Sequence, residues 1–535
     1  MIVEPHPDTS LSDDVCVAGD LTFLQQGGMR RDIYLPKKVR IFLPIHGRRR
    51  SFIFMGSHGQ ANILKFRWYG YCGLDSTKIP AMTKYDAIII GSGQAGNPLA
   101  KKLANAGWKV VVIERKWVGG TCINVGCTPT KTMIASGRIA YLVNRSKDFG
   151  VNTTGRSVDM QEVVRRKNAI VLSYRESTMK GLLQPANIKI EFGNAVFTGE
   201  KEVTVTKEDG SQSALTASHI FINTGASPAI PPIPGLESSG YFTSDTIMDV
   251  MEVPRHLVII GGSYIALEFG QLYRRLGSEV TVIESGGHFL PKEDEDIATA
   301  LKKILEDDGI KIRTNAKVTE VSGGPGEVTV KFGAEAITGS HLLVATGRSA
   351  NTAALNLTSS GVELDEHGFI RTNDKLETNV PGVYALGDVK GGPQFTHISY
   401  NDHLIVYKNL IEKGNESIDS RQSIYCLFTD PELGRVGLTE KQAREKGLHI
   451  KVATMPADWI ARAYENSETR GLLKVVVDAD NKKIIGASIL CEGGGELMSI
   501  LQMAMMGDVT YDRIRDAVFA HPTFAESLNN LFASL

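Results

Sequence analysis

The sequence predicts an α/β protein with two Rossmann-like domains and a separate α+β domain at the C-terminal end. Two observations lead to this prediction: one residue pattern occurs twice, and the pattern changes after about residue 420. In each copy a short apolar run, a glycine turn, a helical stretch and a second apolar run ending on glutamate follow in order. The 535 residues are enough for several domains of ordinary size.

The first copy occupies residues 85–114. Its apolar run 85–90 suits a buried parallel strand, residues 97–106 suit a helix, and residues 109–113 suit a second strand. Gly107, which follows the helical stretch, fits the left-handed conformation in which many helices end. These spacings predict one complete β-α-β unit.

The turn of the first copy, with Gly91, Gly93 and Gly96, is typical of a dinucleotide site. The first glycine allows the tight turn, the second lets a pyrophosphate approach the backbone, and the third lets the helix pack on the strand. The pyrophosphate would then lie at the helix N-terminus, where free N–H groups favour negative charge. Glu114 ends the second strand, where its carboxylate can accept hydrogen bonds from ribose hydroxyls. A unit that binds no nucleotide is the alternative.

The second copy departs from the ideal turn. Strands are expected over 256–260 and 279–283 and a helix over 265–276, but Gly261 is followed by Ser263 and Ala266 in place of the other glycines. Glu284 again ends the second strand, and a carboxylate there binds a free 2′-hydroxyl and repels a 2′-phosphate. The second copy therefore predicts a nicotinamide nucleotide site that favours NADH over NADPH, with an unoccupied structural repeat as the alternative.

The last part of the chain predicts the α+β domain. Strand-like runs at 472–477 and 483–490 alternate there with helical stretches at 496–506 and 511–518.

A close cysteine pair, Cys122 and Cys127, follows the first unit. About one helical turn between the two residues would bring their Cα atoms within the roughly 4.4–6.8 Å that a disulfide requires. We expect both at the start of a helix, whose dipole lowers the pKa of a thiol. The sequence offers no second cysteine or histidine pair at ligand spacing, so the alternative of a zinc site is disfavoured and no resident metal is expected. Inert buried cysteines are a further alternative.

Residues 1–81 differ from the rest of the chain. Between Arg30 and Arg67 there are ten lysines or arginines and one acid, Asp32. We interpret this segment as a basic, poorly ordered extension upstream of Met82; a nucleic-acid-binding arm is the alternative. The net charge of -1 and the absence of a continuous apolar run of roughly 18 residues predict neither a nucleic-acid nor a membrane partner. Six cysteines in a chain of this length favour the reducing cytoplasm over a secreted disulfide scaffold.

The run 119–131, GGTCINVGCTPTK, resembles the active-site signature of the class I pyridine nucleotide-disulfide oxidoreductases, the family of lipoamide dehydrogenase, glutathione reductase and mercuric reductase. The resemblance extends over about residues 84–535. Further segments match the family in order, and they are Thr224-Gly225, 261–268, 345–348, 382–388 and 521–526.

The resemblance implies an FAD-dependent oxidoreductase that passes electrons from NADH or NADPH through FAD to a disulfide between Cys122 and Cys127. It divides the chain into an FAD-binding domain in two parts, an NAD(P)-binding domain and a C-terminal dimerisation domain. The expected boundaries are 82–234 and 344–419 for the FAD-binding domain, 235–343 for the NAD(P)-binding domain and 420–535 for the α+β dimerisation domain.

The resemblance also implies catalytic roles. Cys127 would face the flavin and Cys122 the substrate, while Lys131 would pair with Glu268 near flavin N5. An acid–base dyad, His521 and Glu526, would reach the cysteines from the partner subunit, which makes a homodimer necessary for activity.

The cofactor-binding residues follow from the same matches. Tyr264 would be a gate that covers the flavin face until nicotinamide displaces it, and the helix that starts near residues 395–397 would point its N-terminus at flavin N1 and O2. Expected FAD-binding residues are Gly91, Gly93, Gly96, Glu114, Gly120, Thr121, Lys131, Thr224, Gly225 and Asp388. Expected NAD-binding residues are Gly261, Ser263, Tyr264, Ala266, Glu284 and Gly347.

The acceptor is the least defined part of the prediction. The matches are closest to the mercuric-reductase-like branch, yet the C-terminal segment 529–535 lacks the vicinal cysteines of true mercuric reductases. We therefore expect a small-molecule or protein disulfide, or a dithiol, as the acceptor. A reductase of soft metal ions (mercuric or cupric) or of quinones is the second hypothesis, and a non-catalytic nucleotide sensor is the third.

Overall fold

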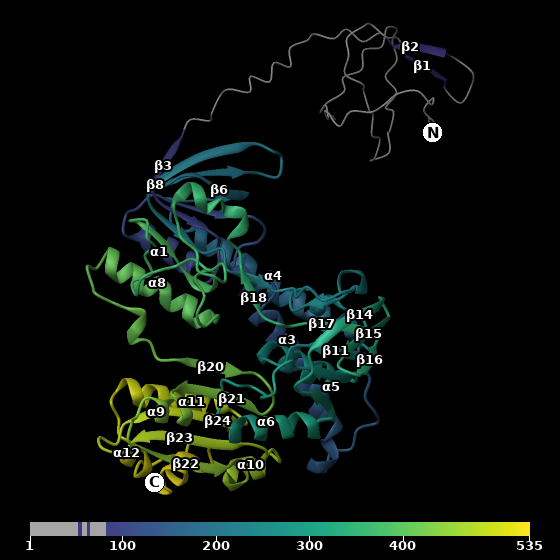
Figure 1. The fold of residues 1–535 in the computed structure, drawn as a ribbon, viewed down its shortest axis with the longest axis vertical. Coiled ribbons are helices and arrows are strands. Elements are labelled where there is room, and N and C mark those ends of the chain that lie inside the picture. Colours follow the sequence, from purple (N-terminus) through teal and green to yellow (C-terminus); the bar gives the residue numbers. More distant parts are fainter. Residues whose placement is uncertain (1–51, 56–60, 65–81) are drawn as a thin grey trace. The chain divides into compact units, whose positions relative to one another are not determined.

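A computed structural model of the chain describes residues 52–55, 61–64 and 82–535. The chain forms two compact units, residues 1–78 and 79–535. In the first unit the described residues are two antiparallel strands, β1 (Phe52–Met55) and β2 (Ala61–Leu64). The prediction that the basic extension is poorly ordered concerns residues that otherwise lie outside the described ones. The second unit is shown in Figure 1.

The first β-α-β unit lies at the centre of a mixed sheet. Its strands, β3 (Thr83–Ile90) and β4 (Val110–Glu114), are parallel and largely buried, and α1 (Gly96–Asn105) connects them. The sheet order is β5-β4-β3-β8-β7-β6, with β19 parallel to β8. The remaining strands are β5 (Ile188–Phe192), β6 (Asn194–Gly199), β7 (Glu202–Thr206), β8 (Gln212–Ile222) and β19 (Val383–Ala385). Because β19 comes from much later in the chain, two distant segments share this sheet.

The second β-α-β unit forms a separate sheet, in which all strands are parallel. Here β11 (His256–Ile260) and β12 (Glu279–Ile283) are joined by α5 (Tyr264–Leu276), in the order β10-β17-β11-β12-β13. The other elements are β10 (Phe242–Thr243), α6 (Glu295–Asp307), β13 (Ile310–Arg313), β17 (His341–Val344) and an antiparallel sheet of β14 (Val318–Gly324), β15 (Glu327–Phe332) and β16 (Glu335–Gly339).

The C-terminal segment is an antiparallel sheet with helices, in the order β20-β21-β24-β23-β22. Its elements are β20 (Ile424–Leu427), β21 (Glu432–Gly437), α9 (Glu440–Glu445), β22 (Ile450–Pro456), α10 (Ala461–Glu465), β23 (Leu472–Asp478), β24 (Ile484–Cys491), α11 (Gly494–Met506), α12 (Tyr511–Arg515) and α13 (Ser527–Ala533). The helix expected over 511–518 ends earlier, at Arg515, as α12. The Asn529 side chain donates hydrogen bonds to the carbonyls of Ile514, Arg515 and Ala517, and these bonds replace those of a continued helix.

Four helices and two short strands connect these sheets. They are α2 (Gly120–Asn124), α3 (Cys127–Asn144), α4 (Met160–Leu183), β9 (Ala226–Pro228), β18 (Arg348–Ala350), and α8 (Thr396–Leu410), with α7 (Leu357–Ser360) a single turn. Helix α8 lies beside α1 (Figure 1). Both the start of α3 and the start of α8 carry residues of the site described below.

A buried arginine, Arg275 of α5, joins three parts of the chain. Its guanidinium donates to the Asp430 side chain and carbonyl, pairs with Asp308 at 3.4 Å, and lies 3.9 Å from the ring centre of Tyr141 in α3. We expect Arg275→Met to lower the free energy of unfolding by about 3–5 kcal/mol, because two buried carboxylates each lose one of their cationic partners and keep only Arg470 and Arg138. Lys303→Met is the control, since its ion pair with Asp307 is exposed and should be worth less than about 1 kcal/mol. Urea titration of both FAD-saturated variants measures the difference; equal losses would contradict the prediction.

Candidate active site

Both glycine turns and the cysteine pair line one cavity of about 2660 Å³. The cavity lies at the C-terminal ends of the parallel strands of the two sheets, where open α/β folds bind their ligands. Most of the residues expected to bind cofactors line it. Gly96 and Ala266 do not, because they pack the helices onto the strands.

The first turn has no room for side chains. Gly91 has a φ of +100°, and a Cβ on it would lie 2.4 Å from the Asn223 carbonyl oxygen; a Cβ on Gly96 would lie 2.5 Å from the Gly91 carbonyl oxygen. No side chain caps α1, so its first N–H groups are available to an anion. Glu114 Oε2 accepts from the backbone N (3.0 Å) and hydroxyl (2.8 Å) of Ser92, which fixes the carboxylate at the strand end. The glycine turn, the start of α1 and Glu114 together form a cradle that fits the pyrophosphate and ribose of FAD.

The second turn repeats the arrangement. A Cβ on Gly261 would lie 2.3 Å from the Ala345 carbonyl oxygen, and Glu284 accepts from the backbone N of Gly262 (2.7 Å) and of Gly286 (2.6 Å). Ser263 precedes the first residue of α5 and does not cap the helix with its hydroxyl. The turn therefore keeps free N–H groups for a second dinucleotide.

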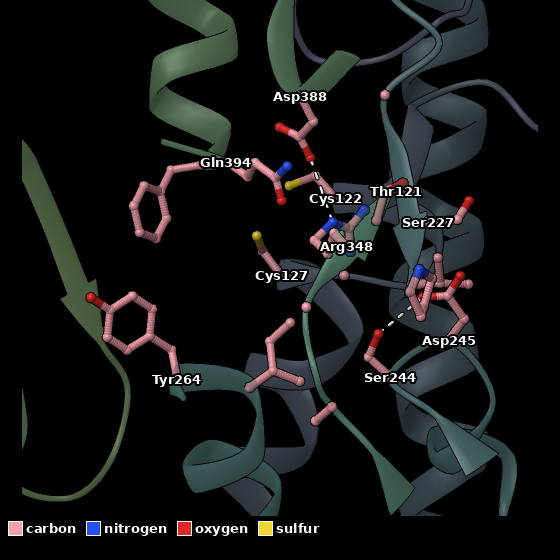
Figure 2. Close-up of a pocket in the computed structure, with 18 of the residues that line it drawn as sticks. Thr121, Cys122, Cys127, Ser227, Ser244, Asp245, Tyr264, Arg348, Asp388 and Gln394 are labelled. Carbon is pink, nitrogen blue, oxygen red and sulfur yellow. Dashed lines mark hydrogen bonds and ion pairs between the residues drawn. The ribbon is translucent and has the colours of Figure 1, made fainter. Parts of the chain in front are cut away.

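The two cysteines lie on different helices, which corrects the expectation that both begin one helix. Cys122 is within α2, whereas Cys127 is the first residue of α3. Gly126 separates the helices; a Cβ there would lie 2.8 Å from the Thr121 carbonyl oxygen. Both cysteines line the cavity, and Figure 2 shows both sulfurs pointing into it, toward the side where Tyr264 lies.

The two thiols also differ in acidity, which corrects the expectation that both pKa values fall. The neighbouring Cys122 thiol, together with Thr396 and the charge of Lys131, lowers the pKa of Cys127 to about 6. The neighbouring Cys127 and burial raise the pKa of Cys122. Cys127 is therefore the more acidic of the two thiols.

The Thr396 hydroxyl lies 3.3 Å from the Cys127 sulfur. Because a donor to the thiolate lowers the pKa of a thiol, we expect Thr396→Val to raise the pKa of Cys127 from about 6 toward about 7. The thiolate, present above this pKa and lost as the pH falls through it, should then disappear at a higher pH. The pH dependence of alkylation of the reduced protein measures this midpoint. Thr132→Val is the control, since Thr132 bonds to the Thr128 carbonyl within α3; an unchanged midpoint in Thr396→Val would contradict the prediction.

Lys131 and Glu268 are in contact, with Nζ 2.6 Å from Oε2. Lys131 lies about one helical turn after Cys127, and its ammonium is also 4.6 Å from the ring centre of Phe428. Glu268 accepts a further hydrogen bond from the backbone N of Phe428 at 3.1 Å. The pair thus joins α3 to α5, and both residues line the cavity.

Asp388 has a partner that the sequence did not indicate. Its carboxylate lies 3.8 Å from Arg348 Nε, and Figure 2 shows the pair close to Thr121 and Cys122. Burial raises the pKa of Asp388, and the charge of Arg348 opposes that shift. Gly120, Thr121, Thr224, Gly225 and Gly347 also line the cavity.

His521 and Glu526 form a pair away from this cavity. The Nδ1 atom of His521 lies 2.9 Å from Glu526 Oε2, and the histidine side chain is 72% exposed. Neither residue lines the cavity, so a single chain does not bring this dyad to the cysteines.

No helix among the described residues has the length and apolar character needed to cross a membrane. No group of three or more histidine, cysteine or acidic residues in the same part of the chain could hold a metal ion.

With two dinucleotide cradles converging on a cysteine pair, the fold and site are those of a flavoprotein reductase. Residues 85–402 match the family described as "Pyridine nucleotide-disulphide oxidoreductase", and residues 423–532 match its dimerisation domain. The chain belongs to this family.

Particular relatives narrow the comparison. The "Probable pyridine nucleotide-disulfide oxidoreductase RclA" of Escherichia coli K12 is 39% identical over 456 residues, which cover 84% of this chain and 99% of that protein. A mercuric reductase of Lysinibacillus sphaericus is 36% identical over 449 residues, 83% of this chain and 81% of that protein. A solved structure described as the Cu(II) complex of HOCl-induced flavoprotein disulfide reductase RclA from Escherichia coli matches with a TM-score of 0.79 and 38% identity, over 85% of this chain and 100% of that one.

These comparisons confirm the predicted family, the α/β fold class and the enzyme class. The chain is an NAD(P)H-dependent flavoprotein oxidoreductase that uses FAD, and its dimerisation domain indicates a homodimer.

Proposed function

We propose that this enzyme reduces a disulfide acceptor with a dithiol formed by Cys122 and Cys127, at the expense of NADH. The observation that supports this proposal most strongly is that Cys122 and Cys127 line the same cavity as both glycine turns. An acidic thiol facing such a cavity is typical of redox-active cysteines and not of inert buried ones.

Residues of the first fold would hold FAD. We assign the pyrophosphate to Gly91, Gly93 and the start of α1, the adenosine ribose to Glu114, and the ribitol chain to Asp388; Gly96, Gly120, Thr121, Lys131, Thr224 and Gly225 complete this set. When bound, the flavin supplies a carrier that takes an electron pair from a reduced nicotinamide and can pass it to a disulfide.

Residues of the second fold would hold the nicotinamide nucleotide. We assign its pyrophosphate to Gly261 and Ser263, its adenosine ribose to Glu284 and its nicotinamide end to Tyr264. Ala266 packs the helix, and Gly347, at which a Cβ would meet no atom within 4 Å, completes this set. Because the Glu284 carboxylate is fixed at the strand end by two backbone N–H groups, it should repel a 2′-phosphate. We expect kcat/KM to be at least about tenfold higher for NADH than for NADPH. Glu284→Gln should narrow that ratio; equal values in the unmodified enzyme would contradict the assignment.

The cysteines then act in a fixed order. Cys122 attacks one sulfur of the acceptor disulfide, whose S–S bond breaks as a mixed disulfide forms, and the departing thiolate takes up a proton. The Cys127 thiolate attacks the sulfur of Cys122, which releases the second thiolate and closes the Cys122–Cys127 disulfide. The pair thereby loses the electron pair that the acceptor gains.

This order requires a base, because the neighbouring Cys127 and burial raise the pKa of Cys122, whose thiol must lose its proton before it attacks. His521, oriented by Glu526, is suited to accept that proton and to return it to the departing thiolate. We propose that the dyad acts on the cysteines of the partner subunit, since it does not line the cavity of its own chain.

A second acceptor, Cu(II), is favoured by one specific observation. The related RclA structure is described as a Cu(II) complex, and thiolates are ligands that suit copper. The described residues include no group of three or more histidine, cysteine or acidic side chains that could hold a metal ion, so copper would act as a substrate at the Cys122–Cys127 pair.

An acceptor screen tests the proposal. NADH oxidation by the FAD-loaded dimer is followed with lipoamide, glutathione disulfide, Cu(II) and Hg(II), each with the unmodified enzyme and with Cys122→Ser. We expect a disulfide to sustain turnover that Cys122→Ser abolishes. Turnover with Cu(II) and with neither disulfide would replace the proposal by its second candidate. Failure of NADH to reduce the bound flavin would instead support a nucleotide sensor.

A further inference from the structure

A fully buried carboxylate, Asp402 of α8, joins three segments of the chain. Its side chain is 0% exposed. Its Oδ2 atom accepts from the backbone N of Gly387 at 2.7 Å and lies 3.6 Å from Lys390 Nζ, while its Oδ1 atom accepts from Arg421 Nη2 at 2.6 Å. Gly387 and Lys390 begin and end a short 3₁₀ helix, and Arg421 lies shortly before β20. Because two cations compensate its charge, the buried carboxylate is held from both sides.

The backbone at Gly387 has little freedom to move. Gly387 has a φ of +71°, and a Cβ on it would lie 2.9 Å from Ser399 Oγ and 3.2 Å from Asn223 Oδ1. The chain therefore passes between α8 and the end of β8 at a point that suits only glycine. Because Asp402 also holds the Gly387 N–H, the turn that leads into Asp388 has a fixed orientation.

Asp388, the next residue, lies on the cavity side of this turn. It lines the cavity, and its carboxylate points toward Arg348, 3.8 Å from Nε (Figure 2). Asp402 does not line the cavity. It can therefore influence a bound cofactor only through the groups that it holds, and one of these groups is the backbone next to Asp388.

We propose that Asp402, acting through the Gly387 N–H, is a positioning residue that orients Asp388 toward FAD and so slows the release of the cofactor. The inference rests on the proposed function, in which Asp388 binds the ribitol chain. The alternative is a purely structural carboxylate that joins α8 to the segment before β20. A structural role affects the stability of the fold, but its effect on FAD does not depend on the Asp388 side chain.

The test measures the rate at which the oxidised, FAD-loaded dimer releases FAD. The protein is diluted into an excess of apo-D-amino-acid oxidase, which traps released FAD and gains activity in proportion. All three partners of Asp402 are donors, so Asp402→Asn turns an NH₂ group toward at least one of them. We expect this change to speed release by about tenfold, and Asp388→Asn to speed it by a similar factor. When Asp388→Asn is already present, Asp402→Asn should add less than about threefold, because no carboxylate is left to orient.

Two further variants complete the design. Asp430 is also a buried carboxylate paired with an arginine, but it does not line the cavity. Asp430→Asn should therefore lower the melting temperature and leave the release rate within about twofold. Arg421→Gln removes the partner of Oδ1 and keeps the bond to Gly387, so it should speed release by about threefold and add nothing when Asp388→Asn is present. It replaces Asp402→Asn in the cycle if that variant does not fold.

The outcomes separate this inference from the proposed function. If Asp388→Asn speeds release and Asp402→Asn does not, the positioning role is wrong and the assignment of Asp388 stands. The positioning role is also wrong if the effects of the two changes multiply in the double variant, or if Asp430→Asn speeds release as much as Asp402→Asn. If Asp388→Asn leaves the release rate unchanged, the assignment of Asp388 to FAD is itself wrong, and the inference is overturned with it.

Discussion

Replacing Cys122 with serine is expected to lower turnover with a disulfide acceptor by at least about a thousandfold, while the protein still folds and binds FAD. The reason is that the attacking sulfur is lost, and a serine hydroxyl at neutral pH does not replace a thiol in disulfide exchange. Steady-state oxidation of NADH with the acceptor found by screening measures the loss.

The control for this change is a cysteine outside the cavity. Cys491 is buried in β24 and does not line the site, so Cys491→Ala should keep turnover within about twofold of the unmodified enzyme. If Cys122→Ser retained more than about a tenth of the activity, electrons would leave by a route other than this cysteine.

The second large effect is expected for His521→Ala. Loss of a positioned acid–base group typically costs about 10²–10⁴ in rate, and Cys122 depends on such a group because its pKa is raised. Turnover with a disulfide should fall by that amount. Glu526→Gln should fall less, because it keeps a hydrogen-bond partner for Nδ1 and loses only the charge.

Mixed dimers test whether the dyad acts across the subunit boundary. A heterodimer of one Cys122→Ser chain and one His521→Ala chain contains one intact site if the histidine serves the partner's cysteines. It contains none if the histidine serves its own chain. We therefore expect the heterodimer, purified with two different tags, to recover about half of the unmodified activity. Activity no higher than that of the two homodimeric variants would contradict a shared site.

Much of the fold follows from local patterns in the sequence. The two β-α-β units are predictable because short apolar runs form buried parallel strands, and because residues such as Gly91 lie where backbone leaves no space for a Cβ. The structure begins α5 one residue earlier than expected and ends α12 at Arg515. The second difference depends on Asn529, a residue from another helix, and no pattern near 515 indicates it.

The site is less predictable where its chemistry depends on contacts between distant residues. The spacing of Cys122 and Cys127 indicates a pair but not the break at Gly126, so it cannot show that only Cys127 gains from the start of α3. The hydrogen bond from the Gly387 N–H to Asp402 joins positions 15 residues apart, and no local periodicity indicates it. The roles assigned to His521 and Glu526 come from family resemblance, because their partner lies in a second chain.

The central claim is that Cys122 and Cys127 form the disulfide that NADH reduces, and alkylation read by mass spectrometry tests it most directly. The oxidised, FAD-loaded protein is treated with iodoacetamide before and after NADH is added under anaerobic conditions. We expect Cys122 to be labelled only after NADH, while the labelling of Cys426 and Cys491, which are free thiols in the structure, stays the same. Labelling of Cys122 that does not depend on NADH would contradict the account.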